Sequence, residues 1–314
     1  ADKDYYANVK GRKTHDDGTS PTAPEIIKDI LSKELDQTST LPGASSYDDW
    51  RYAFCQNEKI NSKQLIENLA SVSAYIPRFD YQGNFKFSEI PLNPSSTTLN
   101  PDGTDSENHT IKDSDVIDFS FGRTPYEDIV TKIEFKYNFD YARDEFLSKR
   151  IIDIDTFVCY DIDDEGTVEG YNYDYYGFES NSVGEGINHD ERKLEIDDDR
   201  GKLIRDDATA ERFMTWMLSW YSQQHLTMKI KLPLKYMNLE IGDIIDTDKV
   251  LGGIKPYNID YTSKSQDIAQ YQSFLPYFII TSTNKTLDSI TIECTQMHYL
   301  WATTAIEVVD DVIK

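Results

Sequence analysis

The residues from Asp207 to Asp248 change their hydrophobic period abruptly, and this change constrains the fold more than any other feature of the sequence. Asp207 is placed to cap a helix, whose apolar residues recur at three- and four-residue spacing: Ala210, Phe213, Met214, Met217, Leu218 and Tyr221. From Leu226 to Tyr236 every even position is apolar, which predicts a strand with one buried face. Gly242-Asp243 then marks a turn into a further strand. A helix that leads into strands in this way indicates how the chain folds, and it contains no catalytic or binding motif of its own.

Composition and charge narrow the class of protein. The 314 residues suffice for one large domain or two ordinary ones, and 21 Tyr, 14 Phe and 4 Trp suit a strand-rich core. A formal net charge of −24 argues against direct binding to nucleic-acid phosphate or to an anionic membrane surface. No apolar run approaches the roughly 20 residues of a membrane span, so no membrane insertion of this chain is expected. The first residues are polar and show no signal peptide.

The three cysteines, Cys55, Cys159 and Cys294, lie far apart in the sequence. They offer neither a disulfide framework nor a CxxC metal site, which favours synthesis in a reducing compartment. Each lies within or beside an apolar stretch, so all three are interpreted as buried small hydrophobic residues.

The first part of the chain divides into three predicted segments. Residues 1–21 form an N-terminal arm, in which Tyr5, Tyr6 and Val9 suggest a short strand. Residues 22–90 form a small α+β unit of two helices and a hairpin. Its helix signals are a capping box at Thr22 and Glu25, a cap at Ser62 and a stop at Pro77, and its hairpin turns at Gln82-Gly83-Asn84. Residues 91–114, rich in Pro, Ser, Thr, Asn and Asp, form a linker or long surface loop.

Residues 115–314 form a predicted β-rich domain. Alternating apolar residues predict strands at 117–121 and 129–141, and a hairpin spans 278–296. An acidic insertion covers 161–200; between Asp161 and Asp199 it holds 14 acidic residues against Arg192 and Lys193. We therefore predict a strand-rich α+β fold: a barrel-like antiparallel β domain with the 208–225 helix packed on it, plus the small helical-and-hairpin domain.

The search for chemistry yields few candidates. The sequence contains no GxSxG, HExxH, GxxxxGKS/T or GxGxxG motif, so we predict no enzymatic activity and no cofactor. Asp161, Asp163 and Glu165 are candidate metal ligands because Asp161–Gly166 resembles a calcium loop. Asn172, however, stands where a bidentate Glu is needed, and an acidic turn is the preferred interpretation. Asp197-Asp198-Asp199-Arg200-Gly201 is interpreted in the same way, as a hairpin tip.

Three lysines alternate along the strand that follows Leu226: Lys229, Lys231 and Lys235. The simplest interpretation is the solvated side of a strand. The alternative is that they are subunit-interface residues, which contact an acidic neighbouring subunit.

Several segments, in order, resemble the tail-hub proteins of tailed bacteriophages. The similar segments are the strand Tyr6–Arg12, the helix Thr22–Leu31, the aromatic segment Trp50–Phe54, the hairpin Phe79–Phe87, and the helix, strand and Gly-Asp turn of Ala208–Ile245. Segments 91–114, 161–200 and 254–274 have no counterpart in that family. In longer hub proteins the Gly-Arg strand follows an earlier barrel domain. We therefore expect this chain to be the C-terminal part of a larger hub, or its barrel to take strands from elsewhere.

The resemblance implies a structural protein of the virion, made in the host cytoplasm and located at the tail tip or baseplate. Hub proteins of this family are typically homotrimers that join the tail tube to the baseplate or tip around the DNA exit channel. DNA would pass through without specific binding, and an acidic channel wall would repel its phosphates. Two alternatives stay open: a receptor- or carbohydrate-binding tail module built on the tyrosines of 171–178, and a hydrolase acting on cell-wall glycan.

Overall fold

The computed structural model describes residues 20–36, 45, 47–55, 59–80, 83–91, 110–153, 158–162, 168–172, 192–222, 224–249, 253–258 and 274–298. The predicted N-terminal arm, the greater part of the 91–114 linker and most of the acidic insertion lie outside these residues. Within them, no helix is long and apolar enough to cross a membrane.

The small unit contains two helices and one hairpin, as predicted: α1 (Ala23–Glu34), α2 (Ser62–Ser71), β1 (Tyr75–Phe79) and β2 (Phe85–Glu89). The carboxylate of Glu25 accepts a hydrogen bond from the Thr22 N–H at 2.8 Å, which confirms the capping box. Two details of the prediction are wrong. Asn61, not Ser62, caps α2, because its Oδ1 accepts from the Lys63 N–H. Pro77 does not end this helix; it lies in β1, where a two-stranded sheet tolerates proline.

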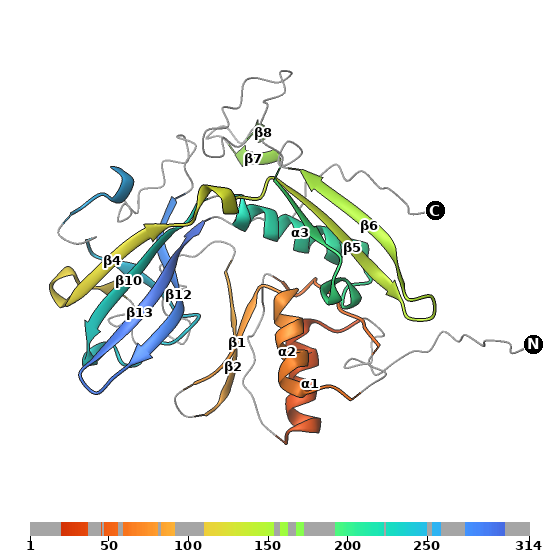
Figure 1. The fold of residues 1–314 in the computed structure, drawn as a ribbon, viewed down its shortest axis with the longest axis horizontal. Coiled ribbons are helices and arrows are strands. Elements are labelled where there is room, and N and C mark those ends of the chain that lie inside the picture. Colours follow the sequence, from red (N-terminus) through yellow and green to blue (C-terminus); the bar gives the residue numbers. More distant parts are fainter. Residues whose placement is uncertain are drawn as a thin grey trace, which may run out of the picture.

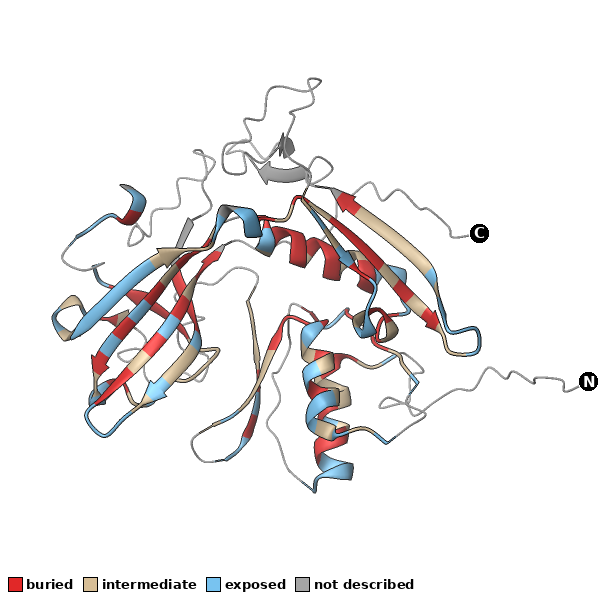
Figure 2. Ribbon diagram, viewed as in Figure 1, coloured by how far each residue is buried: buried red, intermediate tan, exposed pale blue. Residues whose placement is uncertain are grey.

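A six-stranded sheet forms the largest layer, with the strand order β3-β11-β12-β13-β10-β4. The strands are β3 (Thr110–Ile111), β4 (Asp118–Arg123), β10 (Leu226–Pro233), β11 (Ile244–Thr247), β12 (Phe274–Lys285) and β13 (Ser289–His298). All neighbours are antiparallel except β11 and β3. The sheet curls into a half-barrel, and even-numbered residues of β10 are buried as predicted (Figures 1 and 2). Beyond Pro233 the chain leaves the sheet in a short helical turn, Leu234–Tyr236.

A second layer consists of α3 (Asp207–Tyr221) and a three-stranded sheet of β6 (Glu145–Asp153), β5 (Lys132–Asp140) and β9 (Lys193–Ile196). The strand predicted at 129–141 therefore belongs to this sheet, and its assignment to the barrel framework was wrong. Its buried face packs on α3, where Phe135 meets Phe213 edge-on with ring centroids 5.4 Å apart. In Figure 1, α3 lies between the curled sheet and this smaller sheet.

One hydrophobic cluster joins the small unit to the second layer. It includes Ile27 of α1, Leu69 of α2, Phe135 of β5 and Phe213 of α3. A separate cluster fills the curled sheet around Ile230, Phe278 and Ile292. The described residues thus confirm the predicted strand-rich α+β class. The division at 91–114 stays a prediction, because most of that segment lies outside them.

Two further local predictions are corrected by the hydrogen bonds. Asp206, one residue before the predicted cap, holds the start of α3 by accepting from the Thr209 N–H at 2.9 Å. Asp197–Gly201 is not a hairpin tip, because Asp199–Lys202 form a helical turn capped by the Asp198 side chain. Gly201 packs so closely on β5 that an added Cβ would lie 2.0 Å from the Lys136 carbonyl oxygen. The acidic run therefore includes a glycine that close packing requires.

Candidate interaction surface

Strand β4 is the last strand of the curled sheet in the order of the described strands. Among the described strands it pairs with β10 alone, from Asp118 opposite Lys231 to Arg123 opposite Leu226. Just beyond, the Thr124 N–H donates to the His225 carbonyl at 3.0 Å. In an antiparallel pair the peptide groups alternate in direction, so those of even-numbered residues in β4 face β10. The peptide groups of Phe119 and Phe121 consequently face away from β10.

Aromatic side chains follow this edge. Phe119 and Phe121 are 41% and 37% exposed and stack with ring centroids 6.3 Å apart. Tyr257 meets Phe121 edge-on, and the Arg123 guanidinium carbon lies 4.8 Å from the centroid of the Tyr257 ring. Exposed apolar side chains on a sheet edge are typical of an interaction site, because free peptide groups and apolar surface lie together there.

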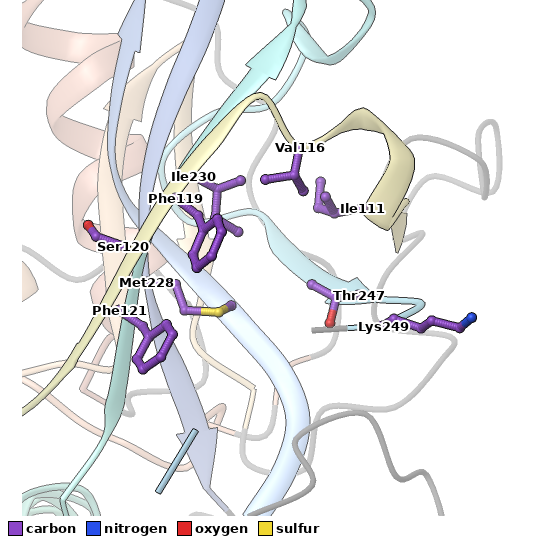
Figure 3. A pocket seen from close by; sticks show the side chains of 9 residues that line it. All are labelled: Ile111, Val116, Phe119, Ser120, Phe121, Met228, Ile230, Thr247 and Lys249. Carbon is purple, nitrogen blue, oxygen red and sulfur yellow. The ribbon is translucent and has the colours of Figure 1, made fainter. Parts of the chain in front are cut away.

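An open pocket lies at the seam of the half-barrel, between β4 and the opposite edge (Figure 3). Phe119 and Phe121 line it from β4, and Met228 and Ile230 line it from β10. It is also lined by Ile111, Thr247 and Lys249 from the opposite edge and by Val116, which lies just before β4. The apolar face of β4 therefore continues into the interior of the curled sheet. We define Phe119, Phe121, Arg123, Tyr257 and this pocket as the seam surface.

Sequence reasoning predicted a strand at 117–121 but did not single it out as a site. Apolar alternation indicates that a strand has an apolar face, yet it does not tell a central strand from an edge strand. The position of β4 depends on pairing with β10, more than a hundred residues later in the chain.

The three candidate interface lysines lie on the surface, and acidic residues of the same chain lie beside them. Lys229 forms an ion pair with Glu293 at 2.8 Å, and Lys235 forms one with Asp115 at 2.5 Å. Lys231 is exposed and stands opposite Asp118 in the sheet register. A contact to a neighbouring subunit would compete with these pairs, and it stays a prediction.

Of the three candidate metal ligands, Asp161 alone lies among the described residues. Asp161 belongs to β7 (Val158–Ile162), which pairs with β8 (Val168–Asn172), and stands opposite Glu169 in the register. Asp163 and Glu165 lie outside the described residues, so the metal site is an untested prediction. Of the cysteines, Cys294 is buried, and burial raises the pKa of its thiol to about 12. Cys55 is exposed, which corrects the interpretation that it is buried.

Among the described residues, Glu134 and Arg78 are each the centre of an inward-facing cluster of paired charges. Glu134 is buried on β5 and pairs with Lys193 at 2.5 Å and Lys149 at 2.9 Å; burial raises its pKa, but the two lysine hydrogen bonds outweigh burial and lower it overall. Arg78 of β1 pairs with Glu240 and, at 3.0 Å, with Asp243. The second cluster, which we call the Arg78 clamp, joins the hairpin to the Gly-Asp turn of the curled sheet. Carboxylates paired with cations in this way hold strands together.

His225 connects the end of α3 to the sheet. Its Nδ1 lies 2.8 Å from the Gln296 carbonyl oxygen and its Nε2 lies 2.8 Å from that of Trp220. Burial lowers the pKa of His225, although both carbonyl contacts act in the opposite direction. The folded-state pKa thus lies below the unfolded value of about 6.5, so the neutral ring contributes stability at higher pH.

We therefore expect the free energy of unfolding to fall as the pH drops below about 6.5, because the unfolded chain then binds the proton more readily. Urea titrations between pH 8 and pH 5 measure this dependence. In His225→Gln the slope over that interval should become shallower by up to about 1.4 kcal/mol per pH unit. Equal slopes for the native protein and His225→Gln would show that His225 does not cause the pH dependence of the stability.

Comparison with known proteins identifies the fold. The sequence matches no protein-family model and no curated protein. The structure, however, matches a chain of the virion of a native gene transfer agent particle, with a TM-score of 0.50 at 10% identity. The chain has the fold of a virion protein. The match covers 95% of this chain and 53% of the other, so the chain spans about half the length of that virion protein.

Tail proteins give lower scores. The 43 kDa tail protein of prophage MuSo2 from Shewanella oneidensis matches at TM-score 0.41 and 10% identity, covering 90% of this chain and 67% of its own. Prophage tail protein gp18 from Listeria monocytogenes matches at TM-score 0.41 and 14% identity, covering 88% and 65%. The match to the gene transfer agent virion chain confirms, at the level of fold, the expected similarity to virion structural proteins.

Proposed function

We propose that this chain is a structural component of a phage tail, forming the hub that joins the distal tail tube to the baseplate or tip around the DNA exit channel. The observation that supports it most is the fold match to a virion protein over 95% of this chain. The inward-facing ion clusters also suit a structural role, because they join elements rather than present reactive groups. The proposed location is the virion tail.

The proposed assembly is a homotrimer in contact with tail-tube and baseplate proteins. A hub that surrounds a channel must be a closed ring, and rings arise when one surface of each copy meets a different surface of the next. The seam surface is one surface available for such a contact. A net charge of −24 would keep the DNA backbone from adhering to a channel wall formed by this chain.

Electron microscopy of the purified protein tests the proposal. We expect three-fold rings with a central channel whose wall carries more acidic than basic side chains. Particles without a channel, or a channel lined by lysine and arginine, would contradict the hub function.

A further inference from the structure

We propose that the pocket of the seam surface accepts the Leu287 side chain of a neighbouring copy, and that Lys249 beside the pocket pairs with Asp288 of that copy. This inference rests on the proposed self-association and names the two surfaces that make it. The inserted element is the turn Thr286-Leu287-Asp288-Ser289 between β12 and β13, which we call the hairpin tip.

The hairpin tip is fixed by hydrogen bonds and carries an exposed aliphatic side chain. The Thr286 N–H donates to the Ser289 carbonyl at 2.9 Å, and the Thr286 hydroxyl accepts from the Ser289 N–H at 3.2 Å. Leu287 is 94% exposed at this position. A single exposed leucine is common on protein surfaces, but the two central residues of a short hairpin turn are usually Gly, Asn or Asp. A leucine on a turn that is already ordered loses little entropy on insertion into a partner.

The pocket has the apolar lining that an aliphatic side chain requires. Phe119 and Phe121 line it from β4, and Met228 and Ile230 line it from β10 (Figure 3). Nine residues line it in all, which is about the number of neighbours that one buried side chain has in a protein core. The flexible Met228 side chain adapts to the shape of what it contacts. The pocket therefore suits one apolar side chain of a partner.

Charges of opposite sign lie beside the pocket and beside the leucine. Lys249 lines the pocket and is exposed, and Asp288 follows Leu287 directly and is also exposed. Neither of the two forms an ion pair in the part of the chain that the structure describes. Lys229 and Lys235, by contrast, are paired with carboxylates of their own chain. Insertion of Leu287 brings Asp288 to the side of the pocket where Lys249 supplies the missing partner.

A polar group inside the pocket also favours a docked main chain. Thr247 follows Ile245 by two residues on β11, so it faces the same interior side of the curled sheet. Its buried hydroxyl has no hydrogen-bond partner among the described residues. Such a hydroxyl is costly, and a peptide group of the hairpin tip would offset that cost.

The occupant is a second copy, because Leu287 does not fill the pocket of its own chain. It is 94% exposed on a turn that continues directly from the paired strands, which join Lys285 to Ile290. The contact between the tip of one copy and the pocket of the next joins two different surfaces. Contacts of this kind, repeated around an axis, close a ring such as the proposed hub.

Leu287→Ala should weaken the association of the copies by about thirtyfold, because most of the apolar surface buried in the pocket is lost. Sedimentation over a range of concentrations measures this change. At a dilution where the copies are separate, unfolding of the variant should match that of the native chain, which distinguishes a lost contact from a folding defect. The matched control is Leu35→Ala, which truncates a leucine that is 41% exposed at the end of α1 and should leave association unchanged.

A charge exchange tests the pairing of the two surfaces. Asp288→Lys and Lys249→Asp should each weaken association by about tenfold, because each places like charges together, and the double variant should restore it. Glu67→Lys on α2 makes the same change of charge at an exposed position and should have no such effect. A double variant as weak as the single ones would overturn the proposed pairing.

The same measurements distinguish this contact from the proposed trimer. If the native chain forms trimers and neither Leu287→Ala nor the charge reversals weaken them, the tip contact is wrong while the trimer stands. Native dimers that Leu287→Ala separates and the charge exchange restores would support the tip contact and contradict the trimer. A native chain that stays monomeric at every concentration would contradict both.

Discussion

Arg78→Met should lower the free energy of unfolding by about 3 kcal/mol, because it leaves two carboxylates at a buried junction without their cation. The Arg78 side chain is only 10% exposed and contacts both Glu240 and Asp243. Around this clamp the hairpin packs directly on the turn: an added Cβ on Gly242 would lie 3.2 Å from Cβ of Ser88. The carboxylates of Glu240 and Asp243, once Arg78 is replaced, therefore have little room to move out into water. Chemical unfolding at pH 7 measures the loss.

Two companion variants show whether charge is the cause. Arg143→Met removes an arginine that is 69% exposed and pairs with Asp140 and Glu145 on the surface, so it should cost less than about 1 kcal/mol. Adding Glu240→Gln and Asp243→Asn to Arg78→Met removes the two charges that Arg78 balanced and should restore part of the loss. An Arg78→Met protein as stable as the native one would show that the clamp does not hold the hairpin.

Phe213→Ala should lower the free energy of unfolding by about 3 to 5 kcal/mol, because it opens a cavity where the small unit meets the second layer. The Phe213 ring is fully buried, and it meets Trp50 edge-on at 6.3 Å and Phe135 at 5.4 Å. Its removal therefore takes contacts from both sides of the junction at once. The midpoint of urea unfolding, with an unchanged slope, gives the loss directly.

The control for this variant is Leu287→Ala, at the turn between β12 and β13. Leu287 is 94% exposed, so its truncation should change the stability by less than about 0.5 kcal/mol. A small effect of Phe213→Ala, close to that of the control, would contradict the single hydrophobic cluster that joins these elements.

Local sequence patterns predicted the positions of the helices and strands well, but they predicted poorly which strands pair with one another. The change of period after Tyr221 located α3 and β10, because each buries a face whose spacing is visible in the sequence. The same kind of alternation at 129–141 predicted a strand correctly but assigned it to the wrong layer. Periodicity reports that a face is buried, whereas the partner, here Phe213 of α3, is decided by packing between residues far apart in the chain.

The candidate site shows the same limit. The lysines were found because they break an apolar pattern, and a pattern does not reveal that Glu293 and Asp115 would stand beside two of them. The seam surface was missed because its aromatic residues resemble those of a central strand. Only the strand order shows that β4 has no described neighbour beyond β10, and that order follows from long-range hydrogen bonds.

The mass of the native assembly in solution tests the central claim most directly. One chain weighs 36.2 kDa, so a closed three-fold ring has three times that mass. Sedimentation equilibrium of the 314-residue chain over a range of concentrations should give a trimer. A protein that stays monomeric at every concentration, or that forms dimers, would contradict the proposed hub.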